Sequence, residues 1–339
     1  MRHPLMPDVS HIEHAASVSV LIAPQLLRPT ANGAKQNGDV STLVKMPYKI
    51  AGHTMGTPEY TVCEAIELLS WIGADGVEIV VQDGYKSGLP RYASQEELAK
   101  IKKCAEDFHI QIIALTPYNS RFDSLDEEVR QAEIADIRKV VDYCEYFGAK
   151  YIRIYGGNRA AGDNVQIPDR RAKLVDSMRT LGDYAQSKGV TLVIENHFNT
   201  MTVSAKESAE LMKEINHPAV RVLYDQANLA FTENEGYEEA VALQQDYVVY
   251  MHVKDLVFKE GVGFSSGDVS HPDESERNVY TRIVGQGVLP WQKVLSLVHQ
   301  KGYDGWLSLE YERRWHPDDI PDASIGMRKS LEFLRGLEI

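Results

Sequence analysis

The segment GVTLVIENHFNT, residues 189–200, contains a short apolar run that stops abruptly at polar side chains. Residues 191–194 are β-branched or apolar, which is typical of a strand buried on both faces of a parallel sheet. Glu195, Asn196 and His197 follow immediately. A carboxylate and an imidazole at the end of a buried strand either meet water or lie at the rim of a pocket, where a metal ion or a substrate contacts them.

Similar strands recur through most of the chain. Eight short apolar runs are predicted to be strands, at residues 48–53, 76–81, 111–115, 151–155, 191–195, 220–225, 248–253 and 306–310. Eight segments with helical periodicity alternate with them: Glu59–Trp71, Gln95–Phe108, Glu127–Phe147, Asp169–Lys188, Ala205–Ile215, Gly236–Gln245, Pro290–Lys301 and Ala323–Leu334. This alternation predicts an α/β fold, a single (β/α)8 TIM barrel. A doubly wound open sheet is the alternative, but residues 51–59, AGHTMGTPE, lack its GxGxxG turn.

The composition excludes several classes of protein. The chain has 339 residues, of which 43% are hydrophobic and 25% charged, as in ordinary globular proteins. Its formal net charge of −13 argues against nucleic acid as a partner, because binding a phosphate backbone needs a basic surface. No apolar run approaches the ~20 residues that cross a bilayer, so no membrane partner is expected. Cys63, Cys104 and Cys144 show no CxxC spacing, which argues against a disulfide framework and predicts a cytoplasmic protein.

Residues 1–46 differ from the rest and are predicted to be an N-terminal extension, with the barrel at residues 47–339. Residues 17–27, SVSVLIAPQLL, are apolar but short, and acidic residues precede them where a secretory signal would be basic. Residues 28–41, RPTANGAKQNGDVS, are polar and rich in turn formers, as in a linker. We therefore expect the extension to be poorly ordered or loosely packed. Met46 directly precedes the first strand and is a candidate natural start, which mass spectrometry of the native protein would test.

Three further strands end in the same way as the strand at 191–195. Asp225 lies in VLYDQAN, His252 in YMHVKD and Glu310 in LSLEYE, each at the end of its predicted strand. The carboxyl ends of all strands of a TIM barrel open on one face, so these three meet Glu195 there. Three carboxylates and one imidazole suit a divalent ion such as Mn²⁺, Mg²⁺, Co²⁺ or Zn²⁺. In a metal-free cluster, the alternative, neighbouring carboxylates would repel one another and raise their pKa values.

A series of motifs resembles the xylose isomerase-like TIM-barrel superfamily, the sugar phosphate isomerase/epimerase group. In chain order the motifs are VEIV, YIRIYGG, LVIENH, LYDQAN, MHVKD, GQGVLPW and GYDGWLSLEYE. The likeness covers residues 47–337. As an ordered set the motifs are specific for the superfamily, but they single out no one substrate.

The resemblance implies that Glu195, Asp225, His252 and Glu310 bind one divalent ion, with Mn²⁺ favoured over Mg²⁺, Co²⁺ or Zn²⁺. It also implies that Glu195 and Glu310 flank the substrate and act as the catalytic acid and base. The implied activity is isomerisation or epimerisation of a sugar, sugar acid or sugar phosphate, in which the proton next to a carbonyl is removed through a metal-stabilised enediolate. Proteins of this group are often dimers or tetramers, so the resemblance is compatible with a homo-oligomer.

Five further residues are candidates for substrate binding: Arg153, Lys254, His197, Glu78 and His53. Arg153 points into the barrel if YIRIY alternates, and the alternative is a structural ion pair. Lys254 lies two residues beyond the imidazole ligand and is expected to contact substrate or to neutralise a ligand carboxylate, with pairing to the next aspartate as the alternative. His197 could instead orient a ligand through a hydrogen bond. Glu78 is placed at the end of the second strand, with an arginine pair as its alternative, and His53 at the end of the first.

Asn228 bears on the reaction. The ketose 3-epimerases that the chain resembles carry His three residues after the aspartate of the sixth strand, and this chain has Asn228 there. This departure weighs against a simple free-ketohexose epimerase and against the related apurinic endonucleases, which need further His and Asp ligands. The alternative on the same scaffold is a metal-dependent lyase, such as an inosose or dehydroshikimate dehydratase or an eliminase acting on an oxidised glycoside. A further alternative is a non-catalytic metal-binding subunit.

Residues 259–288 are predicted to be an insertion between the seventh strand and its helix. The insertion is polar and rich in Gly, Ser and Pro, so it has no core of its own. Long loops in compact domains are commonly functional, and this one leaves the barrel on the predicted catalytic face, so we expect a lid that excludes water. Trp315 is a candidate for the pocket wall, whereas Trp291 and Trp306 are expected to pack in the core or at the rim.

Overall fold

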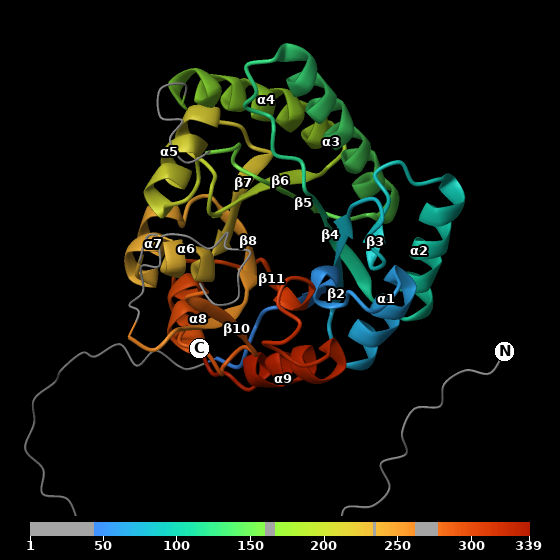
Figure 1. The fold of residues 1–339 in the computed structure, drawn as a ribbon, viewed down its shortest axis with the longest axis vertical. Helices are drawn as coiled ribbons and strands as arrows, with labels where there is room; N and C mark the ends of the chain where they lie inside the picture. The colour runs from blue at the N-terminus through green and yellow to red at the C-terminus, as the bar shows by residue number, and fades with distance from the viewer. Residues whose placement is uncertain (1–43, 160–166, 233–234, 262–276) are drawn as a thin grey trace, which may run out of the picture. The chain divides into compact units, whose positions relative to one another are not determined.

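The computed structural model describes residues 44–159, 167–232, 235–261 and 277–339. Eight parallel strands close into a barrel, and helices surround it (Figure 1). The strands follow the order β1-β11-β8-β7-β6-β5-β4-β2, and β1 pairs with β2 to close the ring. The predicted single (β/α)8 barrel is confirmed.

The elements of the barrel have the following bounds. The strands of the ring are β1 (Ile50–His53), β2 (Gly76–Val81), β4 (Gln111–Pro117), β5 (Tyr151–Ile154), β6 (Thr191–Glu195), β7 (Val220–Asp225), β8 (Val248–Val253) and β11 (Trp306–Leu309). The helices are α1 (Val62–Trp71), α2 (Gln95–Asp107), α3 (Glu127–Phe147), α4 (Ile167–Ser187), α5 (Ala205–Ile215), α6 (Gln226–Thr232), α7 (Tyr237–Gln244), α8 (Trp291–Gln300) and α9 (Ala323–Arg335). Short elements complete the description: β3 (Gly88–Leu89), which pairs with β2 outside the ring, and the 3₁₀ turns η1 (Thr54–Gly56) and η3 (Glu312–Arg314).

Buried apolar side chains form two layers, one between strands and helices and one inside the barrel. The inner layer consists of Ala51, Ile113, Ala114, Val193, Leu223, Tyr250 and Trp306. Successive side chains of a strand point to opposite faces, so residues two positions after the inner ones also face the interior. Glu195, Asp225 and His252 lie two residues after three of these inner residues. The alternation of side chains along the strands therefore places these three polar residues inside the barrel, next to the inner apolar layer and toward the carboxyl ends of the strands.

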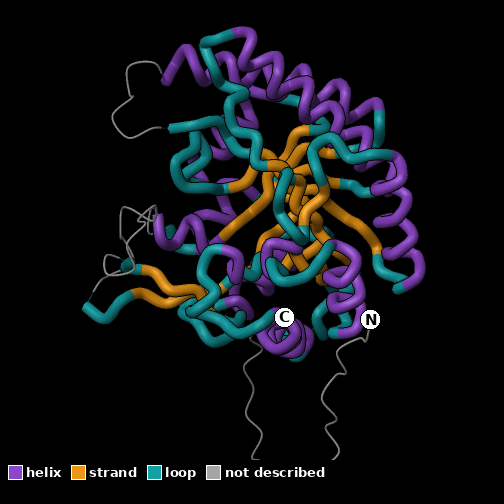
Figure 2. Tube along the Cα trace, turned by 45° about the vertical axis from the view of Figure 1, so that its right-hand side comes forward, coloured by secondary structure: helices purple, strands orange, loops and turns teal. Residues whose placement is uncertain are grey.

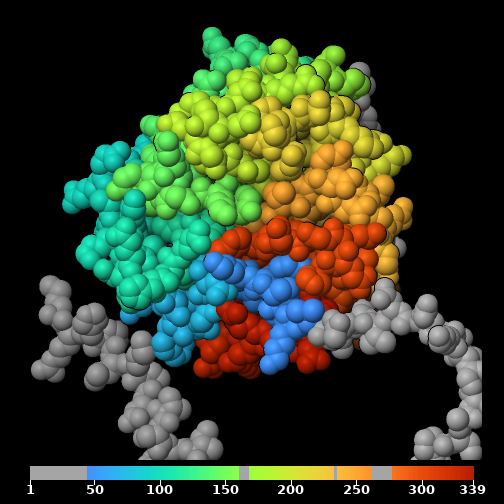
Figure 3. Space-filling model, turned by 180° about the vertical axis from the view of Figure 1, so that it is seen from behind, coloured from blue at the N-terminus to red at the C-terminus, as the bar shows by residue number. Residues whose placement is uncertain are grey.

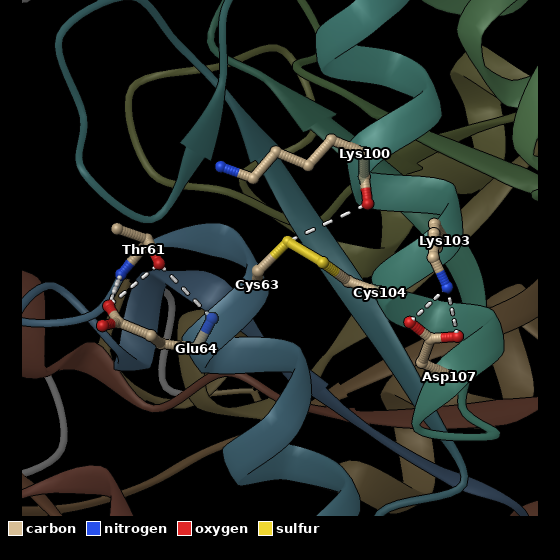
Figure 4. The surroundings of a disulfide bond; sticks show 7 residues. All are labelled: Thr61, Cys63, Glu64, Lys100, Lys103, Cys104 and Asp107. Atoms are coloured by element: carbon tan, nitrogen blue, oxygen red, sulfur yellow. Dashed lines mark hydrogen bonds and ion pairs between the residues drawn. A yellow bond between two sulfur atoms is a disulfide. The ribbon is translucent and has the colours of Figure 1, made fainter. Parts of the chain in front are cut away.

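Helices α1 and α2 are joined by a disulfide between Cys63 and Cys104 (Figure 4). The two Cα atoms lie 5.7 Å apart although 41 residues separate the cysteines in the sequence. The prediction against disulfide pairing is therefore wrong for these two residues, because pairing depends on how α1 packs against α2 and not on sequence spacing. The third cysteine, Cys144, is a free and buried thiol. A disulfide also weakens the argument that cysteine usage places the chain in a reducing compartment.

The first described residues pair with the end of the chain. Val44 N donates to Ile339 O at 2.7 Å, and Lys45 and Glu338 form an antiparallel bridge. Figure 3, a view from behind, shows the first barrel segment lying beside the C-terminal segment. Residues 1–43, most of the predicted extension, lie outside the described residues, so its predicted disorder or loose packing stays a prediction.

A hairpin follows β8: its first strand directly precedes the predicted insertion, and its second strand lies in the later part of the insertion. Strand β9 (Asp255–Phe258) pairs antiparallel with β10 (Val279–Arg282), and the hairpin stands off the barrel strands (Figure 2). The insertion, predicted to have no core of its own, contributes the strand β10, whose Thr281 is buried. Residues 262–276 lie outside the described residues, so the lid role stays a prediction. Among the described helices, none combines the length and apolar character needed to cross a membrane.

Candidate metal centre and substrate pocket

Four side chains meet inside the barrel at the carboxyl ends of its strands. Glu195 is the last residue of β6, Asp225 is the last residue of β7, and Glu310 directly follows β11. His252 lies in β8, where the strand register pairs it with Asp225. One donor atom of each residue lies within 4.8 Å of the others, and all four side chains are buried.

The imidazole of His252 lies between two of the carboxylates. Its Nδ1 is 3.2 Å from Glu195 Oε1 and 3.4 Å from Glu310 Oε2. Asp225 Oδ2 is buried and accepts no hydrogen bond from the described residues, although Lys254 Nζ lies 3.0 Å away as an ion-pair partner. Oxygen donors and one nitrogen donor that converge in this way are the ligands of divalent ions. The four side chains could therefore hold one cation.

Burial and nearby cations set the charges of the carboxylates. Burial raises the pKa of Asp225 to about 7, although the Lys254 ammonium opposes this shift. Burial also disfavours ionisation of Glu195, but the Arg153 guanidinium holds its pKa below the usual range. Glu310 likewise keeps a lowered pKa despite burial, because Lys254 lies beside it. Carboxylates held ionised in a dry site attract a cation strongly.

The second nitrogen of His252 faces another carboxylate. His252 Nε2 lies 3.2 Å from Glu78 Oε2 and donates to it, which leaves Nδ1 directed at Glu195 and Glu310. Burial alone would lower the pKa of His252, but the carboxylates of Glu310 and Glu78 raise it well above its usual value. A carboxylate that accepts from one nitrogen of a histidine fixes the ring so that the other nitrogen can bind a metal.

Glu78 lies within β2, not at its end, and it is completely buried. It also accepts from Tyr250 Oη at 2.7 Å and from Thr116, and His53 Nε2 lies 3.4 Å from its Oε1. His53 Nδ1 accepts the backbone N–H of Met55, so its Nε2 carries the ring proton, although this buried nitrogen makes no hydrogen bond to the described residues. Neither Glu78 nor His53 lines the cavity described below. Their predicted contact with substrate stays a prediction.

The two candidate cations of the pocket both pair with candidate ligands. Arg153 Nε lies 2.7 Å from Glu195 Oε2 in a buried ion pair, the arrangement expected as the alternative to substrate binding. Lys254 Nζ lies 2.7 Å from Glu310 Oε2 and 3.0 Å from Asp225 Oδ2. Asp255, the next aspartate, instead accepts hydrogen bonds from four backbone N–H groups and does not pair with the Lys254 ammonium. Arg153 and Lys254 also line the cavity, and their contact with substrate stays a prediction.

His197 lies on the loop after β6 and lines the cavity. Its Nδ1 donates to the backbone carbonyl of Phe198 at 2.8 Å, because a carbonyl can only accept. Burial lowers the pKa of His197 to about 4 in spite of the nearby Glu195 carboxylate. The ring is therefore neutral near pH 7, and Nε2 is left as a hydrogen-bond acceptor.

Asn228 lies on α6, a helix that the periodicity of the sequence did not reveal. Its side-chain amide donates to Asn196 O at 2.8 Å and approaches Glu195 Oε1 at 3.4 Å, and its backbone N–H donates to Asp225 Oδ1 at 2.8 Å. Asn228 thus contacts two of the candidate ligands, Glu195 and Asp225. An amide cannot exchange a proton as an imidazole does.

A cavity of about 510 Å³ opens over these groups. Arg153, His197, Lys254 and Glu310 line it, as does Trp315, which confirms the prediction for that tryptophan. Several other lining residues were not predicted from the sequence: Met55, Tyr118, Phe198, Phe231, Arg277, Asn278, Val279, Thr281, Glu312 and His316. Phe231 lies on α6, and the others lie on loops, on short 3₁₀ turns or on the hairpin, where no periodic pattern indicates which side chain faces the pocket.

Fold and site together define a TIM barrel with a candidate metal centre at the carboxyl ends of its strands. Residues 66–337 match the family described as xylose isomerase-like TIM barrel. The chain belongs to this family.

Curated relatives and solved structures agree with this assignment. An inosose dehydratase of Geobacillus thermodenitrificans is 27% identical over 41% of this chain and 46% of its own length. Inosose dehydratase 2 of Bacillus cereus is 26% identical over 62% of this chain and 72% of its own length. The chain thus spans between about half and three quarters of these relatives.

Solved structures with low sequence identity share the fold. The 3-keto-D-glucoside 4-epimerase of E. coli superposes with a TM-score of 0.66 at 17% identity, covering 85% of this chain and 99% of that chain. A xylose isomerase-like TIM-barrel protein of Mycobacterium smegmatis, solved in complex with magnesium, has a TM-score of 0.64 at 17% identity and covers 85% and 97% of the two chains.

Proposed function

We propose that this protein is a divalent-metal-dependent enzyme that isomerises or epimerises a sugar or a related polyol ketone. One observation carries the proposal: Glu195, Asp225, His252 and Glu310 converge, buried, at the mouth of the barrel and beside a cavity. We expect these four side chains to hold one ion, with Mn²⁺ preferred. A bound dication polarises a carbonyl oxygen and so acidifies the adjacent C–H.

The two glutamates would move the proton. Glu195 is on β6 and Glu310 follows β11, and both contact His252. Strands β7 and β8 lie between β6 and β11 in the ring, so the two glutamates can contact a bound substrate from different sides. Glu310 lines the cavity and is the candidate for proton removal, and Glu195 is the candidate for the opposite side. Both have lowered pKa values and are therefore ionised at neutral pH, the protonation state that a general base requires.

A lyase is the second candidate, and two observations favour it. The curated relatives described above are inosose dehydratases. Asn228 also occupies the place of a titratable histidine, which weighs against the chemistry of free-ketose epimerases. Elimination begins with the same proton removal, and the Lys254 ammonium beside the cavity could then donate a hydrogen bond to a departing hydroxyl.

Proton exchange with solvent tests the shared first step. The metal-loaded protein would be incubated in D₂O with a panel of keto-sugars and inososes, and deuterium next to the carbonyl would be measured by NMR. We expect exchange that disappears with a chelator and falls roughly 10²–10⁴-fold in Glu195→Gln and Glu310→Gln. Glu133→Gln, a buried carboxylate on α3 that accepts backbone N–H groups, is the matched control and should retain exchange.

The products separate the two reactions. An epimerase or isomerase yields a stereoisomer or constitutional isomer without ultraviolet absorbance, whereas a lyase yields a conjugated enone that absorbs there. Absence of exchange over the whole panel with fully metal-loaded protein would contradict both proposals and favour a non-catalytic subunit.

A further inference from the structure

We propose that the substrate is a glycoside whose keto-sugar ring carries an apolar or aromatic aglycone, and that the cavity walls select this aglycone. The inference rests on the proposed function for the chemistry at the sugar ring. Its own basis is the lining of the 510 Å³ cavity, which combines charged groups from the ends of the strands with several aromatic side chains and Met55. We call the charged side, formed by Arg153, Lys254 and Glu310, the polar floor.

Each cation of the polar floor is paired with a buried carboxylate. Arg153 pairs with Glu195 at 2.7 Å, and Lys254 pairs with Glu310 at 2.7 Å. Arg277, which also lines the cavity and lies next to the hairpin, forms an ion pair with Asp319. A phosphate group would need donors that are not already committed to carboxylates. The pairing therefore favours hydroxyl and carbonyl groups over a sugar phosphate.

The first wall runs from the floor to the cavity mouth. The Arg153 guanidinium lies 5.2 Å from the centre of the Tyr118 ring, and Tyr118 Oη lies 3.5 Å from Met55 Sδ. Trp315 Nε1 lies 3.1 Å from the same sulfur, although the tryptophan is 51% exposed. The Arg314 guanidinium stacks on the indole at 4.3 Å. Because Met55 and Arg314 fix the Trp315 indole, this exposed ring is a preformed apolar surface for a ligand.

The second wall consists of four rings in sequence. The ring centres of Tyr155 and His197 lie 4.6 Å apart, those of His197 and Phe198 4.1 Å, and those of Phe198 and Phe231 5.9 Å. Val279 of the hairpin also lines the cavity. Phe198 and Phe231 offer carbon surface to a ligand. The polar lining residues outside the floor come from the hairpin and its approach and from the segment after β11: Arg277, Asn278, Thr281, Glu312 and His316.

The apolar side chains of the two walls favour one kind of group attached to the keto-sugar ring over another. A keto-sugar at the floor can use its hydroxyls there, but hydroxyls of a second sugar against Met55, Phe198 and Phe231 would lose hydrogen bonds to water without replacement. An apolar group gains from the same contacts. The cavity volume lies in the range of pockets that enclose drug-sized ligands, which leaves room beyond one sugar ring.

Binding tests the aglycone without requiring turnover. Affinities of phenyl and methyl β-D-glucoside for the metal-loaded protein would be compared by calorimetry. We expect the phenyl glucoside to bind at least ~10-fold more tightly, because its ring becomes buried between the walls. Trp315→Ala should reduce the ratio to within about threefold, whereas Trp71→Ala, an exposed tryptophan on α1 outside the cavity, should preserve it. Equal affinities in the unmodified protein, or binding of neither glucoside, would overturn the inference.

Turnover of the corresponding 3-keto-glucosides separates this inference from the proposed function. A kcat/KM at least ~10-fold higher for the phenyl than for the methyl compound supports both. Equal rates of deuterium exchange for phenyl, methyl and free keto-sugar would leave the proposed function standing and overturn the aglycone. Tighter phenyl binding without exchange would support the aglycone and contradict the proposed reaction.

Discussion

Glu78 Oε2 lies 3.2 Å from Nε2 of His252, and both side chains are completely buried inside the barrel. The contact joins β2 to β8 across the barrel interior and directs the other imidazole nitrogen at Glu195 and Glu310. Glu78 therefore positions a candidate metal ligand, although it does not line the cavity itself.

Glu78→Gln should weaken metal binding. Replacing the carboxylate by an amide removes the charge that fixes the imidazole, and losses of this kind cost roughly 10–100-fold in metal affinity. Competition with a fluorescent chelator would measure the dissociation constant for Mn²⁺. Glu133→Gln controls for the removal of a buried charge elsewhere. Equal Mn²⁺ affinity in Glu78→Gln and the unmodified protein would refute the positioning role.

Lys254→Met should make folding depend on metal. Lys254 Nζ lies between the buried carboxylates of Asp225 and Glu310, so its removal leaves them uncompensated. We expect the free energy of unfolding of metal-free protein to fall by about 3 kcal/mol and added Mn²⁺ to restore most of the loss. Urea unfolding with and without Mn²⁺ measures both effects. Lys103→Met, whose side chain is 71% exposed, should change neither value; a similar loss there would remove the support for a site-specific role.

Reduction should destabilise the protein through the Cys63–Cys104 disulfide. Reducing the bond between α1 and α2 raises the conformational entropy of the unfolded chain, which lowers the free energy of unfolding by about 2–4 kcal/mol. The free energy of unfolding should fall by that amount in dithiothreitol, and Cys63→Ser should be insensitive to the reductant. Alkylation of unfolded, unreduced protein should modify only Cys144, as read by mass spectrometry. Modification of all three cysteines would show that the disulfide does not form.

Asp322 should contribute pH-dependent stability. It caps α9 by accepting from Ser324 N at 2.9 Å and accepts from Tyr60 Oη at 2.9 Å. Burial opposes ionisation, but these hydrogen bonds lower the pKa of Asp322 below its usual value. Its contribution is therefore complete above the unfolded-state pKa of about 3.9 and is lost as the pH falls through the lower folded-state pKa.

The variant Asp322→Ala should lose about 1 kcal/mol of stability at pH 7. The difference from the unmodified protein should shrink between pH 7 and an acidic pH below the lowered folded-state pKa, where the carboxylate is protonated in both states. Urea unfolding at the two pH values measures this. Glu332→Ala, an exposed carboxylate on the same helix, is the control. A loss that is the same at both pH values would contradict the assigned charge.

The features that the sequence predicted correctly are local ones. Apolar runs and helical periodicity depend on neighbouring residues, so the barrel strands agree closely with the predicted segments. The strand period also explains why Glu195, Asp225 and His252 face the same interior, because all follow inner apolar residues by two positions. Their roles as ligands stay predictions.

The features that the sequence did not reveal depend on closure of the fold. His53 and Glu78 become neighbours only because β1 pairs with β2, and His252 reaches Glu78 only across the finished barrel. The Cys63–Cys104 pair requires α1 to pack on α2. The aromatic cavity walls come from loops and from the short helix α6, whose directions follow from tertiary packing and not from any sequence period.

Anomalous diffraction from crystals of the protein, grown without chelator after elemental analysis of the same sample, tests the metal centre most directly. We predict one divalent ion per chain, bound by Glu195, Asp225, His252 and Glu310, with Glu78 contacting the far side of the imidazole. A chain without an ion, or an ion bound elsewhere while these four side chains point apart, would contradict the account.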